Sequence, residues 1–313
     1  MKLKPVLLAG LGTLGLLTAS GYYYVYLAGA PQLDAQVAPV DPHLQVQLAS
    51  FDSQAMGTTR QYSVILPPGY AQHSQQRYPV IFLLHGGHDN ALSFAEKYAV
   101  APILDQLYSS GKLPPSVVIM PDGNDDRGSN PITDPAYFDG PHGKLDSLIG
   151  SELVNLVKQR YRVADDPHLW AMGGISSGGW GAFNIGLRHL DKFHVLFSHS
   201  GYFTDTSGPA NSPIQFVGQL PPAQLKSLRA YLDAGESDAE FVASSREFHQ
   251  ILNKLHVANQ FHLFPGGHGL SGADYGWNYF RKHLVDSLSY VGTQFRQATL
   301  AQLSLSSPHH PRQ

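Results

Sequence analysis

The chain has 313 residues, of which 42% are hydrophobic and 14% charged, so it can bury a sizeable core. Its 21 lysines and arginines nearly balance 24 aspartates and glutamates, which gives no reason to expect nucleic acid or an acidic membrane surface as a partner. The absence of cysteine excludes disulfides, thiolate metal sites and a cysteine nucleophile.

The N-terminal region predicts export. After Lys2 and Lys4 the chain carries no charged side chain until Asp34, and a short basic stretch followed by an apolar one is typical of a secretory signal or a membrane anchor. We therefore expect residues 1–30 to be a signal peptide or an N-terminal anchor. Because basic residues stay on the cytoplasmic side, the rest of the chain is expected to be extracytoplasmic.

Two forms of this segment stay open. A cleaved signal would use the apolar run of residues 5–19 and would leave a secreted protein. A transmembrane anchor would use residues 5–28, about the 20 residues that cross a bilayer, with the tyrosines of residues 22–26 at the outer interface. The anchor is slightly favoured, because Pro31 follows the small residues 28–30 and makes them a poor cleavage site.

The rest of the chain divides into a linker, one body and a tail. Residues 31–48 hold three prolines and show no helical period, which predicts a linker. Residues 49–295 have a common size for one α/β domain. Residues 296–313 are expected to form a C-terminal tail, disordered from about Ser304.

Apolar runs alternate with helical stretches along the body. Residues 60–70 alternate apolar and polar side chains as a half-buried strand does. Continuous apolar runs, typical of strands buried on both faces, then follow at 78–87, 116–124, 169–177, 194–203, 228–238 and 259–269. Helical spacing of apolar residues marks 145–163 and 239–257. This order predicts an α/β fold with a mostly parallel central sheet and helices on both faces.

The segment Gly174-Ile175-Ser176-Ser177-Gly178 matches the motif G-x-S-x-G. An apolar strand precedes it and a helical stretch follows it, which is the context that this motif needs to present a nucleophilic serine on a sharp turn. Ser176 is the central serine and is predicted to be the nucleophile. Ser177 would then contribute mainly its backbone N–H to an oxyanion hole.

A nucleophilic serine needs a base, and the base needs an acid to orient it. His268 follows the last apolar run within Gly-Gly-His-Gly and is the predicted base. The preceding run ends near three carboxylates, Asp233, Glu236 and Asp238. Asp238 is the preferred acid and Glu236 the second choice. The order serine, acid, histidine along the chain is the one that α/β-hydrolases use.

The segment LLHGGHDN, residues 83–90, suits the second side of an oxyanion hole. Glycines let a backbone approach a substrate closely, and the N–H of Gly87 is the predicted partner of the Ser177 N–H. His85 is expected to hold this loop in place. His88 and Asp89 could line the pocket.

A long polar segment, residues 121–144, is expected to form a lid or a pocket wall. Its acidic side chains Asp122, Asp125 and Asp126 miss the calcium spacing of an EF-hand, and neither a metal nor a cofactor is predicted. Trp180, just after the motif, is interpreted as a core aromatic.

In order along the chain, YSVILPPGY…YPVIFLLHGG, VVIMPDG, AMGGISSGGWGAF, GESD and FPGGHG resemble the landmarks of the putative-esterase branch of the α/β-hydrolases. This branch includes esterase D, enterochelin esterases, a group of feruloyl esterases and the mycolyltransferases. The resemblance covers about residues 50–285 and implies a sheet of eight or nine strands and no cofactor. It also implies a Ser-Asp/Glu-His triad that attacks an ester or thioester carbonyl.

Carried over by position, the resemblance supports Ser176, Asp238 and His268, with the amides of Gly87 and Ser177. The chain departs from the family pattern at Ser177 and Gly87. Relatives often carry a bulky residue at the first position, directly after the nucleophile, and Leu at the second, in the loop of the oxyanion hole.

The resulting hypothesis is an exported serine carboxylic-ester hydrolase that forms an acyl-enzyme on Ser176. Its substrate would be a small-molecule, glycan or lipid ester, and it would meet the membrane only through its N-terminal segment. An acyltransferase with the same triad and a non-catalytic binding protein of the same fold are the alternatives.

Overall fold

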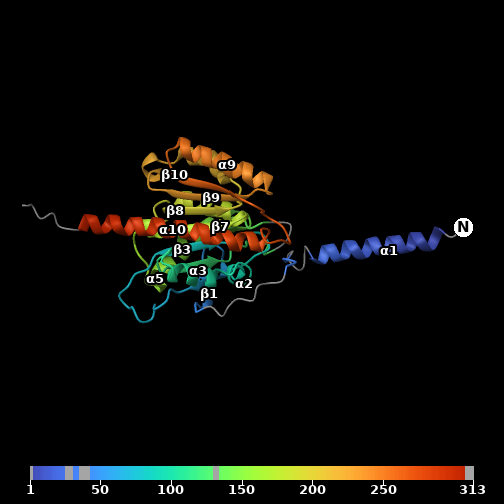
Figure 1. Ribbon diagram of the computed structural model, residues 1–313, viewed down its shortest axis with the longest axis horizontal. Helices are drawn as coiled ribbons and strands as arrows, with labels where there is room; N and C mark the ends of the chain where they lie inside the picture. The colour runs from blue at the N-terminus through green and yellow to red at the C-terminus, as the bar shows by residue number, and fades with distance from the viewer. Residues whose placement is uncertain (1–2, 25–30, 35–42, 130–133, 307–313) are drawn as a thin grey trace, which may run out of the picture.

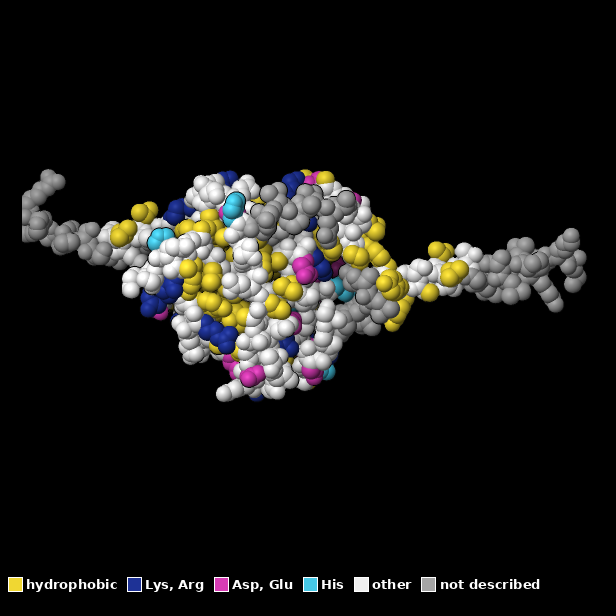
Figure 2. Space-filling view, turned by 90° about the horizontal axis from the view of Figure 1, so that it is seen from below, with side chains coloured by type: hydrophobic (Ala, Val, Ile, Leu, Met, Phe, Trp, Pro, Cys, Tyr) yellow, Lys and Arg dark blue, Asp and Glu magenta, His cyan; other side chains and the backbone are white. Residues whose placement is uncertain are grey.

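The computed structural model describes residues 3–24, 31–34, 43–129 and 134–306 (Figure 1). Helix α1, Leu3–Tyr22, extends away from the body of the molecule, and apolar side chains are exposed along its described part (Figure 2). Within the described residues, no helix combines the length and the apolar character that crossing a membrane requires. The predicted anchor, residues 5–28, runs into residues 25–30, which lie outside the described part.

The core of the fold is an eight-stranded sheet in the order β1-β2-β4-β3-β7-β8-β9-β10. The first two pairings, β1 with β2 and β2 with β4, are antiparallel, and all the others are parallel. The strands are β1 Val46–Ser53, β2 Thr58–Ile65, β3 Val80–Leu84, β4 Val117–Pro121, β7 Trp170–Ile175, β8 Val195–His199, β9 Arg229–Gly235 and β10 Ala258–Phe264. Every predicted strand is present, and the mostly parallel sheet confirms the expected α/β fold.

Strand β1 was not predicted. It begins in the last three residues of the predicted linker and continues into the predicted body, and most of its side chains are only partly buried or exposed. An edge strand of this kind has no continuous apolar run, so its sequence resembles that of a loop. A separate two-stranded hairpin, β5 Asp139–Gly140 and β6 Gly143–Lys144, lies within the long polar segment.

Apart from α1, the longer helices cover both faces of the sheet (Figure 1). The predicted stretch 145–163 forms α4 Leu145–Ser147, a π-helical turn Leu148–Leu153 and α5 Val154–Arg160. The other helices are α2 Ser93–Glu96, α3 Val100–Ser109, α6 Ser177–Gly186, α7 Pro213–Phe216, α8 Pro222–Leu225, α9 Ala239–Lys254 and α10 Trp277–Ser306. Short 3₁₀ turns occur at Pro167–Leu169, Leu187–His189, Pro209–Asn211 and Val217–Gln219.

Helix α10 runs through the region where a C-terminal tail was expected from residue 296. Leu284, Leu288, Val291 and Phe295 lie at helical spacing and are buried against the sheet, so this helix is held by its apolar face. It continues to Ser306, past the predicted start of disorder at about Ser304. Residues 307–313 lie outside the described residues.

Each central strand buries both of its faces. In β3, Phe82 packs into a core beneath α5, α6 and α9, whereas Ile81 and Leu83 pack beneath α3 and α10. A strand that is apolar on both faces can bury all of its side chains only between two layers of helices. The loops at their carboxyl ends remain free to carry polar chemistry.

Candidate active site

Ser176 lies at the sharp turn between β7 and α6. Its backbone has φ 53° and ψ −123°, a strained conformation that costs of the order of 1–3 kcal/mol. Its N–H donates to the carbonyl oxygen of His199 at 2.9 Å, which ties the turn to the neighbouring strand β8. The structure thus places this hydroxyl at the carboxyl end of the sheet, on the kind of turn that the motif predicts.

The glycines of the motif are required by close packing. A Cβ on Gly174 would lie 2.4 Å from the backbone of Gly178, and a Cβ on Gly178 would lie 2.1 Å from the carbonyl oxygen of Leu84. Both distances are far below van der Waals contact, and the atoms that would be met belong to backbone. The strand, the turn and the helix can therefore approach one another only because both positions lack a side chain.

His268 follows β10, and its ring is paired with Asp238. Nδ1 lies 2.8 Å from Oδ2 of Asp238, and the backbone N–H of His268 donates to both carboxylate oxygens, at 2.9 and 3.0 Å. The ring also stacks on Phe241, with centroids 4.6 Å apart. Its Nε2 is buried and has no hydrogen-bond partner among the described residues, so this nitrogen can serve a group in the cavity.

The structure separates the three candidate acids. Asp238 lies just before α9 but makes no side-chain hydrogen bond that caps it, because its carboxylate faces His268. Burial alone would raise the pKa of Asp238, but the hydrogen bonds and charge of His268 hold this pKa below its ordinary value. Glu236 is exposed. Asp233 is fully buried and pairs with another histidine, His199.

This second pair contains the residue whose backbone carbonyl accepts the Ser176 N–H. Nδ1 of His199 is 2.6 Å from Oδ2 of Asp233, and Nε2 of His199 is 2.8 Å from the hydroxyl of Ser287. The hydroxyl of Tyr279 donates to the other oxygen of Asp233 at 2.9 Å. The network joins β8 and β9 to helix α10, and sequence reasoning missed it. A histidine and an aspartate inside apolar runs were its only signal.

Ser176 and His268 line the same cavity, whose volume is about 260 Å³. No hydrogen bond joins them, since Nε2 of His268 has no partner. Gly86, Gly87, His88, Asp89, Asp134, Gly269, Trp277 and Phe280 are among the other lining residues. Of the predicted residues, Ser176, His268 and Gly87 therefore line one cavity. Asp238 does not line it but binds the His268 ring through Nδ1.

The two residues predicted to form the oxyanion hole differ in their position relative to the cavity. Gly87 lines the cavity, and a Cβ there would lie 2.3 Å from a carboxylate oxygen of Asp134. Ser177 is fully buried and is not among the lining residues. Its backbone N–H belongs to the first turn of α6, where N–H groups have no partner within the helix. Burial raises the pKa of Asp134, and the nearby His88 and His268 oppose this rise.

The loop after β3 is held as predicted. Nε2 of the buried His85 accepts the N–H of Gly123 at 2.9 Å, and the hydroxyl of Tyr137 donates to the His85 carbonyl oxygen at 2.8 Å. His88 and Asp89 do line the cavity. Asp89 is neutralised there by Lys97, whose Nζ lies 2.5 Å away.

Each of the three acidic side chains singled out in the long polar segment has its own hydrogen-bond or ion-pair partner. Asp125 pairs with Arg127, with Oδ2 and Nη2 2.5 Å apart, and Asp126 pairs with His142 at 2.9 Å. Asp122 accepts the side-chain amide of Asn124 at 2.7 Å. In the described part of the chain, no group of three or more His, Asp or Glu side chains is placed to hold a metal ion.

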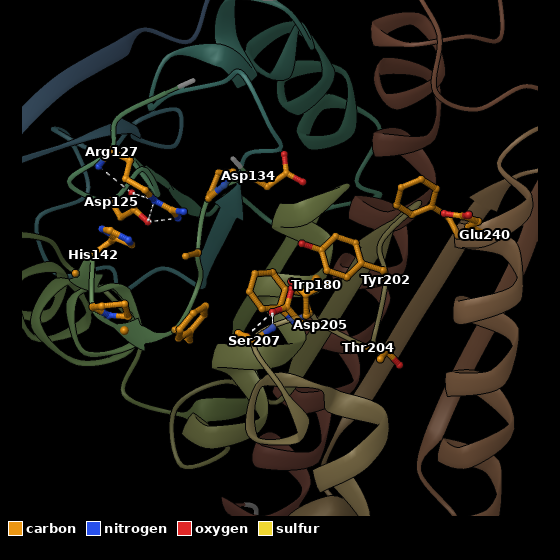
Figure 3. Close-up of a pocket in the computed structure, with 18 residues that line it drawn as sticks. Asp125, Arg127, Asp134, His142, Trp180, Tyr202, Thr204, Asp205, Ser207 and Glu240 are labelled. Carbon is orange, nitrogen blue, oxygen red and sulfur yellow. Dashed lines mark hydrogen bonds and ion pairs between the residues drawn. The ribbon is translucent and has the colours of Figure 1, made fainter. Parts of the chain in front are cut away.

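A second, larger cavity has a volume of about 630 Å³ (Figure 3). Asp134 lines both cavities, and Phe241, which stacks on His268, lines the larger one. The described residues of the segment 121–144 supply much of this lining, so the prediction of a pocket wall is confirmed for them. Further lining residues are Asp125, Arg127, Phe138, His142, Trp180, Tyr202, Asp205 and Glu240.

Trp180 forms part of the floor of this larger cavity. It is 1% exposed, its Nε1 donates to the carbonyl oxygen of Asn211 at 2.8 Å, and its ring stacks on Tyr202 with centroids 5.4 Å apart. Trp180 is thus a core aromatic, as expected, and Tyr202 presents the accessible side of the stack.

Known proteins are similar to this chain in sequence and in fold. An endo-1,4-beta-xylanase/feruloyl esterase of Xylanibacter ruminicola is 29% identical over 225 residues, which cover 67% of this chain and 30% of that protein. The esterase Rv1288 of Mycobacterium tuberculosis is 23% identical over 264 residues, 70% of this chain and 54% of that one. The chain spans between 30% and 60% of the length of the curated relatives that it matches.

A solved structure of a ferulic acid esterase superposes with a TM-score of 0.70 at 27% identity and covers 80% of this chain and 99% of that one. This likeness confirms the expected α/β-hydrolase fold. The family model described as "Putative esterase" matches residues 53–291, well over half of the chain. The chain therefore belongs to the "Putative esterase" family.

Proposed function

We propose that the protein is a carboxylic-ester hydrolase that works through an acyl-enzyme on Ser176. The observation that carries the proposal is the shared cavity, in which a strained serine faces a histidine whose Nε2 has no partner among the described residues. His268 would act as the general base, and Asp238 would hold its ring in the tautomer that leaves Nε2 free.

The first half of the reaction makes the acyl-enzyme. Oγ of Ser176 attacks the acyl carbonyl carbon while Nε2 of His268 takes the hydroxyl proton. The carbonyl oxygen becomes an oxyanion, for which the N–H groups of Gly87 and Ser177 are the proposed donors. The intermediate then breaks its bond to the leaving oxygen. His268 returns the proton to that oxygen, and the alcohol departs.

The second half repeats these steps with water. His268 removes a proton from a water molecule, whose oxygen attacks the ester on Ser176. Collapse of the second intermediate releases the carboxylic acid and restores the serine hydroxyl. Ser176 and His268 are not hydrogen-bonded in the free protein, and such catalytic hydrogen bonds often tighten only when substrate is bound.

The larger cavity favours an aromatic acyl group. Phe241 connects His268 to this cavity, and the rings of Phe138, Tyr202 and Phe241 offer flat apolar surface within it. Relatives that match this chain are named feruloyl or ferulic acid esterases. We therefore propose small esters of aromatic acids as substrates, with the acyl ring in the larger cavity.

The test compares ester hydrolysis by the full chain with that by Ser176→Ala and Ser177→Ala. The substrates are methyl ferulate and p-nitrophenyl esters from acetate to palmitate. Ser176→Ala is expected to lower kcat by at least about 10³-fold, because no other group supplies the nucleophile. Ser177→Ala keeps its backbone N–H and should stay active.

Near-full activity of Ser176→Ala would falsify the proposed mechanism. Hydrolysis of acetate and palmitate esters with rejection of methyl ferulate would refute the aromatic substrate class alone. A product that carries the acyl group on an added sugar would identify an acyltransferase. Failure of a fluorophosphonate probe to label the wild type would point to a non-catalytic binding protein.

The location outside the cytoplasm rests on the N-terminal sequence, Lys2 and Lys4 before an apolar stretch. We propose that this segment exports the chain. A reporter enzyme that works only outside the cytoplasm, fused after Ser306, should be active in cells. An inactive reporter in the presence of full-length protein would contradict export.

A further inference from the structure

Two segments that are far apart in sequence lie together beside the active-site cavity. Residues 31–34, here called the N-terminal clamp, run along residues 266–278, here called the histidine loop. The N–H of Leu33 donates to the carbonyl oxygen of Leu270 at 2.6 Å. Gln32 contributes two more contacts, because its Nε2 donates to the carbonyl oxygen of Tyr275 and its Oε1 accepts the N–H of Trp277, both at 3.2 Å.

Asp34 holds the same loop with its carboxylate. Oδ1 accepts the hydroxyl of Ser271 at 2.9 Å, and Oδ2 accepts the N–H of Gly272 at 2.7 Å and the side-chain amide of Asn278 at 3.1 Å. The bonds from Gln32, Gly272 and Ser271 together keep the pKa of Asp34 below its ordinary value. The carboxylate is therefore ionised near neutral pH and can accept all these bonds at once.

The histidine loop needs such support because of its composition. Gly266, Gly267, Gly272 and Gly276 all have positive φ, and a segment rich in glycine loses much conformational entropy when it is ordered. Within the loop, the N–H of Gly276 donates to the carbonyl oxygen of Gly267 at 2.8 Å. Three other residues outside the loop also bind it. Asp238 accepts the N–H of His268, the hydroxyl of Ser237 is hydrogen-bonded to that of Tyr275, and Lys282 pairs with Asp274.

The fit between clamp and loop is close. A Cβ on Gly276 would lie 2.1 Å from the carbonyl oxygen of Gly269 and 2.3 Å from Oε1 of Gln32. The backbone of the loop itself therefore requires glycine here, and the side chain of Gln32 packs against the same position. The held part of the loop forms part of the cavity wall, since Gly269, Gly276 and Trp277 line the cavity with Ser176. The clamp thus contacts the wall of the active site, although it does not line the cavity.

We propose that the N-terminal clamp is a positioning element for His268, with Asp34 as its main residue. It holds residues 270–278 of the histidine loop, whereas Asp238 holds His268 itself, so that Nε2 stays available in the cavity that Ser176 lines. This role rests on the proposed function, because positioning matters only if His268 acts as a base. A merely structural clamp would affect folding stability and leave the catalytic rate as it is.

The experiment uses the full chain and four variants, Asp34→Ala, Gln32→Ala, Asp34→Asn and Asp165→Ala. Asp165 is the matched control, because its side chain is 78% exposed. It also lies before the amino end of β7, away from the carboxyl ends of the strands that carry the candidate site. kcat and KM are measured with p-nitrophenyl acetate. Hydrogen exchange of the peptide 266–278 is measured by mass spectrometry on the same samples.

Asp34→Ala is expected to lower kcat about 10- to 100-fold with KM nearly unchanged, because a displacement of about 1 Å in a catalytic group can cost this much. Exchange in the histidine loop should rise in the same variant. Gln32→Ala should act in the same direction. Asp34→Asn keeps one acceptor oxygen and should recover part of the rate, and Asp165→Ala should match the wild type.

An unchanged kcat in Asp34→Ala, with or without a lower melting temperature, would overturn the proposal, as would unchanged exchange in residues 266–278. Failure of the proposed function has a different signature. The wild type and Ser176→Ala would then hydrolyse the ester equally, whereas the exchange measurement would still show whether Asp34 holds the loop.

Discussion

The molecule contains two histidine–aspartate pairs with nearly the same geometry. In both, Nδ1 of the histidine meets Oδ2 of the aspartate, at 2.8 Å for His268 with Asp238 and at 2.6 Å for His199 with Asp233. The difference lies at the other ring nitrogen. Nε2 of His199 is bonded to Ser287, whereas Nε2 of His268 has no partner among the described residues.

The pair alone therefore does not define a catalytic histidine. His199 is fully buried and uses both of its ring nitrogens to join β8 and β9 to α10. His268 lies at a cavity, with one nitrogen held and one available. The comparison predicts that the pair of His268 and Asp238 is needed for activity, whereas the pair of His199 and Asp233 stabilises the fold.

The largest effect is expected for His268→Gln. The amide side chain cannot take up the serine proton, so kcat/KM for p-nitrophenyl acetate should fall by at least about 10³-fold. The melting temperature should change little, because His268 is partly exposed. A variant that keeps most of its activity would remove the distinction between the two pairs.

His199→Leu provides the reverse case. It leaves the buried Asp233 with the hydroxyl of Tyr279 but without its histidine partner. Breaking one side of a buried pair typically costs about 3–5 kcal/mol of unfolding free energy. Urea unfolding should show this loss, while the folded fraction keeps a kcat near that of the wild type.

A smaller effect is expected for Asp238→Asn. The amide can no longer enforce the tautomer of His268, and kcat should fall about 10²- to 10⁴-fold. Glu236→Gln is the matched control, because Glu236 is the neighbouring exposed acid. Equal losses in the two variants, measured by steady-state kinetics, would show that the choice between these acids is wrong.

The smallest effect concerns pH. Burial would raise the pKa of Asp238, but its contacts with His268 lower it overall. A carboxyl group with a lowered folded pKa stabilises the protein fully above its unfolded pKa, about 3.9, and loses this contribution as the pH falls through the folded value. The wild type should therefore exceed Asp238→Asn in unfolding free energy most clearly above about pH 4.

Urea unfolding near pH 6 and near pH 3 checks this sign. A difference between wild type and Asp238→Asn that grows in acid would contradict the lowered pKa.

The sequence alone predicted those parts of the candidate site that close packing marks with a local residue pattern. The glycines around Ser176 and the strand that precedes it identify the elbow, because the turn tolerates no bulk at Gly174 or Gly178. His268 stands out for a similar reason, since Gly267 must pass close to Asp238, with a would-be Cβ 2.5 Å from its carboxyl carbon. Such steric requirements leave a trace in the nearest neighbours.

The rest depended on contacts between distant segments. Whether Asp238 caps α9 or faces His268 is decided by how β10 lies beside β9, and the sequence left Glu236 as an alternative. The pair of His199 and Asp233 arises because the two residues are in register on adjacent strands. Asp134 lies between the two cavities and has no local pattern that marks it.

The proposed role of the N-terminal clamp would also change where the working unit of this protein begins. The match to the family model starts at residue 53 and ends at residue 291, so a fragment trimmed to that match would retain Ser176, Asp238 and His268. It would lack Gln32 and Asp34, as well as the last turns of α10. A fragment designed from family boundaries would be expected to fall short in catalytic rate even if it folded, and fragments for kinetic or crystallographic work should begin no later than Pro31.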